Sequence, residues 1–362
     1  MYSDDDLDAA VAAGALPAAS ADALRAHVHA GRLSPAVDEE HFRLITGFND
    51  IFVGIAAIIL LVALAWIGDS IKLADHQYGP EPLTGLFVAA AAWGLAEFFT
   101  LKRRMALPSI ILLLAFVGGV FATAASILVV GLDPVPGDEG ERLLAFILAT
   151  SAAVAAGAAW LHWRRFRVPI TVAAGAAALV AMVLALIGTA LDFDGEGMPD
   201  IILVAMLVAG LGVFALAMRW DGSDPRRETR RSDVAFWLHL LAAPLIVHSV
   251  FSLTGLNDGD GSVVKAVAVI LVYVLLALAA LIIDRRALLV SALAYVLWAL
   301  SDLFEEAGAV ELSFALTAFV IGSALLLLSA FWHNARRAVV QPLPDGMRAR
   351  LPVLDRSVAV AA

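Results

Sequence analysis

Hydrophobic side chains run along this chain in long blocks that are separated by short polar segments. Ten of these blocks could each cross a bilayer as one helix, a length that needs about 20 apolar residues. Because consecutive blocks are joined by polar turns, the pattern predicts an all-α, polytopic membrane protein built from helical hairpins. The ten predicted spans are Ile51–Ile71, Leu83–Leu101, Pro108–Leu132, Arg142–His162, Val168–Leu191, Pro199–Trp220, Asp233–Thr254, Ser262–Ile283, Ala287–Phe304 and Val310–His333.

The remaining segments predict a division into three parts. Residues 1–37 are expected to form a small cytosolic helical hairpin, since Gly14 and Gly31 each follow a short helical stretch. Residues 38–337 form the ten-span bundle, and residues 338–362 an irregular cytosolic tail. The first apolar block begins only near Ile51, after an acidic N-terminus, which is unlike a cleaved signal peptide.

The distribution of basic residues predicts the orientation. When the turns are assigned alternately to two sides, all but three of the 24 lysines and arginines fall on the side of the N-terminus. The three exceptions are Lys72, Arg142 and Lys265. Since basic turns stay in the cytoplasm, both termini are predicted to be cytoplasmic.

Arg-Arg pairs recur at nearly equal intervals on this basic side. They are Arg103–Arg104, Arg164–Arg165, Arg226–Arg227 and Arg285–Arg286. One interpretation is a fourfold duplication of a helical hairpin, with an extra span at each end. The alternative is that any series of regular hairpins places arginines at each inner turn.

Composition supports the membrane class and removes several kinds of chemistry. Hydrophobic residues make up 61% of the chain and charged residues 16%, with a mean hydropathy of +0.88. A soluble chain could not bury so much apolar surface. There is no cysteine, which excludes disulfides, thiolate metal sites and cysteine nucleophiles.

Small residues spaced four apart predict where helices approach closely. The pairs are Ala90 with Gly94, Gly118 with Ala122, Ala153 with Gly157, and Thr171 with Gly175.

The seventh span holds the most unusual side chains. It carries His239 and His248, with Pro244 between them. Titratable groups inside a membrane are costly and mark functional sites by default. Pro244 cannot donate a backbone hydrogen bond to the carbonyl of Leu240, so a helix kink is expected there.

Depth along the spans suggests two partners for these histidines. At about 1.5 Å per residue, His248 and Asp302 lie about 22 and 24 Å from the cytoplasmic surface. His239 and Glu97 both lie within about 10 Å of it. Each histidine–carboxylate pair is a candidate proton relay. The alternative is that each group lies at the interface or bonds to a neighbouring backbone carbonyl.

A polar and aromatic stripe follows the ninth span. Ser291, Tyr295, Trp298 and Asp302 share one helix face, and Tyr273 of the eighth span lies at a similar depth to Tyr295. Such a stripe lines a water-filled path in some transporters, although aromatic stripes more often serve packing.

The other histidines favour a structural role. His162 and His333 lie beside Trp163 and Trp332, which is typical of the aromatic belt at a membrane interface. We expect no cofactor and no metal site, with haem between facing histidines as the remaining alternative.

Four features stand out together: the N-terminal hairpin with Gly14, Leu16 and Pro17, and the segments DEEHFRLITGFNDIFV, LAEFFTLKRRMALPS and DVAFWLHLLAAPLIVHSVF. With these features the chain resembles a bacterial membrane-protein family catalogued as domain of unknown function 2157, or a close relative of it. The resemblance implies a bacterial cytoplasmic (inner) membrane protein. It implies no activity, and therefore no catalytic residues.

Three functional classes follow. A carrier or channel for a small solute or ion is favoured by the ten spans, the recurring hairpins and the titratable groups. A non-catalytic sensor or assembly protein with a membrane-protein partner is the alternative. A membrane enzyme is least favoured, because no nucleophile motif or nucleotide-binding motif is present. The bilayer is the expected environment, and no nucleic-acid partner is expected.

Overall fold

The computed structural model describes residues 4–32, 48–73, 81–134, 137–190, 200–225, 227, 229–256, 263–306, 312–348, 351–352 and 354. Throughout these ranges the regular structure is helical and no strand is present. The predicted all-α class is therefore confirmed. The chain divides into two units, a small one that contains the first two helices and a large one over Leu44–Leu354.

The small unit is a helical hairpin. Helix α1 (Asp4–Ala12) and helix α2 (Ala18–Arg32) contact each other and are joined by a short turn. Gly14 takes the left-handed conformation in this turn, with a φ of 71°, which glycine adopts without steric cost.

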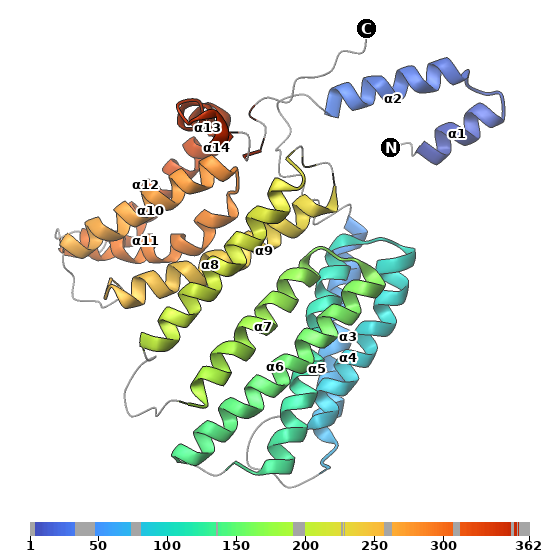
Figure 1. Ribbon diagram of the computed structural model, residues 1–362. Helices are drawn as coiled ribbons and strands as arrows, with labels where there is room; N and C mark the ends of the chain where they lie inside the picture. Colours follow the sequence, from blue (N-terminus) through green and yellow to red (C-terminus); the bar gives the residue numbers. More distant parts are fainter. Residues whose placement is uncertain are drawn as a thin grey trace. The chain divides into compact units, whose positions relative to one another are not determined.

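The large unit contains the predicted spans (Figure 1). Its helices are α3 (Phe48–Ser70), α4 (Pro82–Ala96), a π-helix η1 (Glu97–Lys102), α5 (Ala106–Leu132), α6 (Asp138–Phe166), α7 (Ile170–Gly188), α8 (Asp200–Gly222), α9 (Arg230–Leu253), α10 (Val263–Ile283), α11 (Ala287–Glu306), α12 (Ser313–Ala330), α13 (Trp332–Val340) and α14 (Asp345–Arg348). In the described part of the chain, nine helices are long and apolar enough to cross a membrane. The ninth predicted span coincides with α11, a further helix of 20 residues.

The turns on the predicted cytoplasmic side share one backbone feature. Each contains a non-glycine residue in the left-handed region: Arg104, Arg167, Arg227 and Asp284, with φ between 53° and 61°. Three of the hairpins that these turns close, α4–α5, α6–α7 and α8–α9, pack together more extensively than any other helix pairs. The repeated hairpin thus has a structural counterpart, while its origin by duplication stays a hypothesis.

Close helix contacts occur at glycines, but mostly not at the predicted ones. A Cβ on Gly119 of α5 would lie 2.7 Å from the backbone oxygen of Gly85 on α4. Gly94, Gly118 and Gly157, in contrast, have nothing within 4 Å of such a Cβ. The predicted pairs at these positions are therefore wrong, because four-residue spacing identifies small residues without identifying the helix face that meets a neighbour.

The last predicted span is shorter than expected. Helix α12 ends at Ala330, and Trp332 begins a separate amphipathic helix, α13, whose buried face holds Trp332, Arg336 and Val340. Residues 338–340 continue α13, and α14 follows, so the segment expected to be irregular from residue 338 begins with helix.

Candidate functional site

A buried group of charged side chains joins the ends of four helices on the predicted cytoplasmic side. Its first centre is Asp221, in the last turn of α8, which is 3% exposed. Arg285, in the α10–α11 turn, donates to both carboxylate oxygens of Asp221 and to the backbone oxygen of Ser232 on α9. Nε2 of His239, also on α9, lies 3.0 Å from the same carboxylate. Asp221 therefore links three elements that are separate in sequence.

The second centre is Asp284, the left-handed residue that ends α10. Arg227, in the α8–α9 turn, donates to its carboxylate at 3.0 Å and to its backbone oxygen at 2.8 Å. Trp332 of α13 donates from Nε1 to the other carboxylate oxygen at 2.7 Å. Arg336 lies 3.6 Å from the same oxygen and donates to the backbone oxygen of Pro352. This centre therefore also holds the chain beyond α13.

Asp224 stabilises the α8–α9 turn through hydrogen bonds within it. Its carboxylate accepts from the backbone nitrogen and the hydroxyl of Thr229, at 2.9 and 2.7 Å. Thr229 in turn caps α9 by accepting from the backbone nitrogen of Arg231. These bonds position the turn that carries Arg227.

We call this set the inner charge network: Asp221, Asp224, Arg227, His239, Asp284, Arg285 and Arg336. The network contains three carboxylates and three guanidinium groups. All six of these side chains are nearly completely buried. Buried charges persist only when they are paired and hydrogen-bonded. Burial opposes ionisation of Asp284, but the arginines and Trp332 outweigh it and hold the pKa of Asp284 below its usual value.

Besides these carboxylates and guanidinium groups, the network contains one histidine, His239, whose side chain is positive only after it takes up a proton. It is 0% exposed, and its Nδ1 atom has no hydrogen-bond partner among the described residues. When Nε2 carries the hydrogen that faces Asp221, Nδ1 is an open acceptor. Proton uptake at Nδ1 would place a fourth positive charge beside Arg285 and Arg227 and would let His239 compete with Arg285 for Asp221.

The predicted pairing of His239 with Glu97 is not what the structure shows. His239 binds Asp221, whereas Glu97 accepts two hydrogen bonds from Arg165, at 2.9 and 2.7 Å. Matching depth was insufficient because it does not specify which helices are neighbours. Glu97 begins the π-helix η1, and its ion pair is largely exposed.

The structure pairs His248 with Tyr295, a residue of the predicted stripe other than Asp302. The Nδ1 atom of His248 lies 2.7 Å from the hydroxyl of Tyr295 on α11, and the Tyr295 ring packs on Phe251. The side chain of Asp302 lies outside the described set, so its pairing with His248 stays a prediction. The structure therefore brings together two of the six predicted relay residues, His248 and Tyr295.

Pro244 lies inside α9, and the helix continues through it from Arg230 to Leu253. The proline lacks the amide hydrogen that would otherwise bond to the carbonyl of Leu240. The bend predicted at this position stays a prediction.

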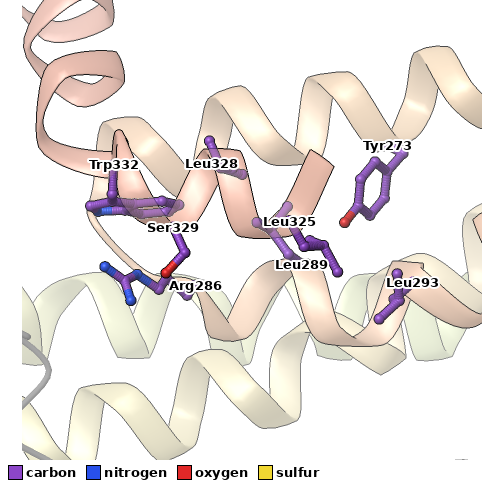
Figure 2. A pocket seen from close by; sticks show the side chains of 8 residues that line it. All are labelled: Tyr273, Arg286, Leu289, Leu293, Leu325, Leu328, Ser329 and Trp332. Atoms are coloured by element: carbon purple, nitrogen blue, oxygen red, sulfur yellow. The ribbon is translucent and has the colours of Figure 1, made fainter. Parts of the chain in front are cut away.

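The remaining predicted residue, Tyr273 of α10, lines a cavity of about 170 Å³ (Figure 2). The cavity lies between α10, α11, α12 and α13. Its walls are mainly leucines, and Arg286 and Trp332 lie at the end opposite Tyr273. The Arg286 guanidinium lies 4.9 Å from the centroid of the Trp332 ring. This cavity therefore adjoins the inner charge network through Trp332.

Two residues that were expected at the interface are buried. His162 is 0% exposed and packs among Trp93, Phe116 and Phe166. Trp332 is 3% exposed and bound to Asp284. The interfacial interpretation of both was wrong, because position at the end of an apolar block does not reveal whether a neighbouring helix covers it.

The sequence did not identify the inner charge network. Arg227, Arg285 and Arg336 were interpreted only as basic residues that set the orientation. The available signal was the presence of Asp221, Asp224 and Asp284 within turns that are otherwise basic. Acidic residues contribute little to the orientation signal, and their presence among arginines indicates possible ion-pair partners.

Within the described residues, no three histidine or acidic side chains are grouped as metal ligands. The arrangement shows ion pairing, with a histidine and an arginine on the same carboxylate. The chain as a whole is a multi-pass helical membrane protein, and comparison with protein-family models, with curated proteins and with solved structures finds no match.

Proposed function

We propose that the protein is a carrier for a small solute or ion, that the inner charge network is its cytoplasmic gate, and that His239 links the gate to protons. One observation carries the proposal: a fully buried histidine shares its carboxylate partner with an arginine from another hairpin. In an apolar bundle, a group with these properties is a functional candidate by default. Proton uptake by His239 would weaken the hold of Arg285 on Asp221 and release the α10–α11 turn.

The groups that face His239 set the sign of this effect. Asp221 of α8 lies 3.0 Å from Nε2 of His239 and attracts a positive imidazole, whereas Arg285, which shares that carboxylate, repels one. Phe214 packs edge-on against the ring and offers no charge. At rest the neutral imidazole matches the balanced network, and acidification favours the open form.

The orientation and the setting belong to the same proposal. The basic turns support a cytoplasmic location for the network and for both termini. The resemblance to domain of unknown function 2157 supports a bacterial inner membrane. His248 and Tyr295, nearer the outer surface, then form a second polar contact between α9 and α11, at the depth where Asp302 was proposed as a partner.

The proposal is tested with protein reconstituted into vesicles that contain a pH-sensitive dye. A potassium gradient with valinomycin drives protons inward, and the wild-type protein should acidify the vesicles faster than protein-free vesicles do. His239→Gln should abolish this difference. His333→Gln, a change at an exposed histidine of α13, should preserve it. Equal rates in His239→Gln and wild type would refute the assignment.

A sensor or assembly protein remains the second candidate, and a separate observation favours it. The network holds α13 through Trp332 and the following chain through Arg336, which donates to Pro352 at 2.6 Å. A change in the network would therefore alter a segment that follows the last span. Absence of proton flux from folded wild-type protein, together with co-purification of one defined membrane protein, would favour this class.

A further inference from the structure

We infer that the cavity between α10 and α13 binds a medium-chain organic carboxylate that carries a second polar group at its far end. The carboxylate lies at Arg286 and the chain runs between the leucines toward Tyr273. This site differs from the inner charge network, and ligand binding there does not require transport.

The shape of the cavity fits one narrow apolar chain. On α11 and its preceding turn, Arg286, Leu289 and Leu293 follow one helix face over seven residues, or about 10 Å. Its volume of about 170 Å³ is close to the ~150 Å³ of an apolar protein cavity that takes up benzene. One alkyl chain or ring fits, and a two-chain lipid does not.

The two ends of the cavity carry different polar groups. At one end Arg286 is the charged lining residue, and its guanidinium offers hydrogen bonds of the kind that carboxylates accept. At the other end, the hydroxyl of Tyr273 points toward the leucines (Figure 2). That oxygen is buried and has no partner among the described residues. A buried polar group without a partner is costly, so a ligand hydroxyl there would bring a gain.

The position of the site in the bundle agrees with this ligand. Arg286 lies at the predicted cytoplasmic turn, and Tyr273 lies 10 residues before the end of α10, about 15 Å deeper. An amphiphile would thus keep its charge at the interface and place its chain in the membrane. Trp332 lines the charged end of the site and donates to Asp284, so an occupant contacts a side chain that is hydrogen-bonded to the inner charge network.

The test uses the full-length protein in lipid nanodiscs and isothermal titration calorimetry, with empty nanodiscs as the reference. The probes are octanoate and 8-hydroxyoctanoate. The wild-type protein should bind both, and 8-hydroxyoctanoate should bind roughly two- to tenfold more tightly because it satisfies Tyr273. Tyr273→Phe should remove this preference. Arg286→Gln should weaken both probes by roughly ten- to a hundredfold.

Two further variants separate binding from folding. Ser329→Phe places a ring into the cavity and should abolish binding while the protein elutes as a single folded species. Arg337→Gln changes an exposed arginine outside the cavity and should bind like the wild type. No binding beyond that of empty nanodiscs, or unchanged affinity in Arg286→Gln, would overturn the inference. An unchanged preference in Tyr273→Phe would overturn the second polar contact.

Discussion

Replacing Asp221 by asparagine should destabilise the bundle far more than the same change at an exposed carboxylate. The substitution preserves the shape of the side chain and a carbonyl oxygen that can face His239. It removes the charge that compensates Arg285, a residue that is 2% exposed. Removing one partner of a buried ion pair costs about 3–5 kcal/mol, because the other charge stays buried without compensation.

Glu97→Gln is the matched control. Glu97 also accepts two hydrogen bonds from one arginine, but the side chains of Glu97 and Arg165 are 36% and 51% exposed. After Glu97→Gln, water can solvate the remaining positive charge of Arg165, so the change in the free energy of unfolding should be much smaller. The geometry of the two pairs is similar, and burial is the main difference between them.

The free energy of unfolding can be followed by tryptophan fluorescence while SDS is titrated into mixed micelles. A third variant, Asp221→Asn with Arg285→Met, removes the uncompensated charge and should recover part of the loss. Equal destabilisation by Asp221→Asn and Glu97→Gln would refute the argument from burial. So would a double variant that is as unstable as the sum of its single changes.

Three further predictions concern packing, pH and topology. Gly119→Ala should destabilise the α4–α5 contact by about 1–3 kcal/mol, because its Cβ would lie 2.7 Å from a facing backbone oxygen. Gly118→Ala, where a Cβ meets nothing within 4 Å, should be neutral or stabilising, and SDS titration compares the two variants. Because the pKa of Asp284 is depressed, its stabilisation is present above the unfolded pKa of about 3.9 and is lost as pH falls through the folded pKa. Asp284→Asn should therefore be less stable at pH 7 and lose less stability on acidification than the wild type; parallel pH profiles would contradict this. Reporter fusions after Ser223 and Asn257 should report cytoplasm and periplasm respectively, and identical signals would contradict the topology.

The helices were predictable because apolar length is a local property. The predicted spans and the observed helices agree closely at most ends; for example, the span Ser262–Ile283 corresponds to α10 (Val263–Ile283). The exceptions arise from tertiary contacts. The π-helix η1 has no signal in apolar spacing, and the break before Trp332 exists because Trp332 turns inward to bind Asp284.

The partners of the titratable groups were less predictable. Depth placed His239 near Glu97, but it could not reveal that α9 packs on α8 and that Asp221 lies at the end of α8. A rotation about the helix axis decides the partner, and the sequence of one helix does not specify it. Burial of Arg285 was hidden for the same reason, since a basic turn is usually solvated.

The central claim is that proton uptake by His239 opens the inner charge network. The chain has no native cysteine, so spin labels can be attached at Ser223→Cys and Asn334→Cys without background. These exposed positions lie on the α8–α9 turn and on α13, which the network connects. Pulsed electron paramagnetic resonance in nanodiscs measures the distance between them. We predict one distance at high pH, a second and longer distance at low pH, and only the first in His239→Gln at every pH. A single distance in the wild-type background that does not change with pH would contradict the account.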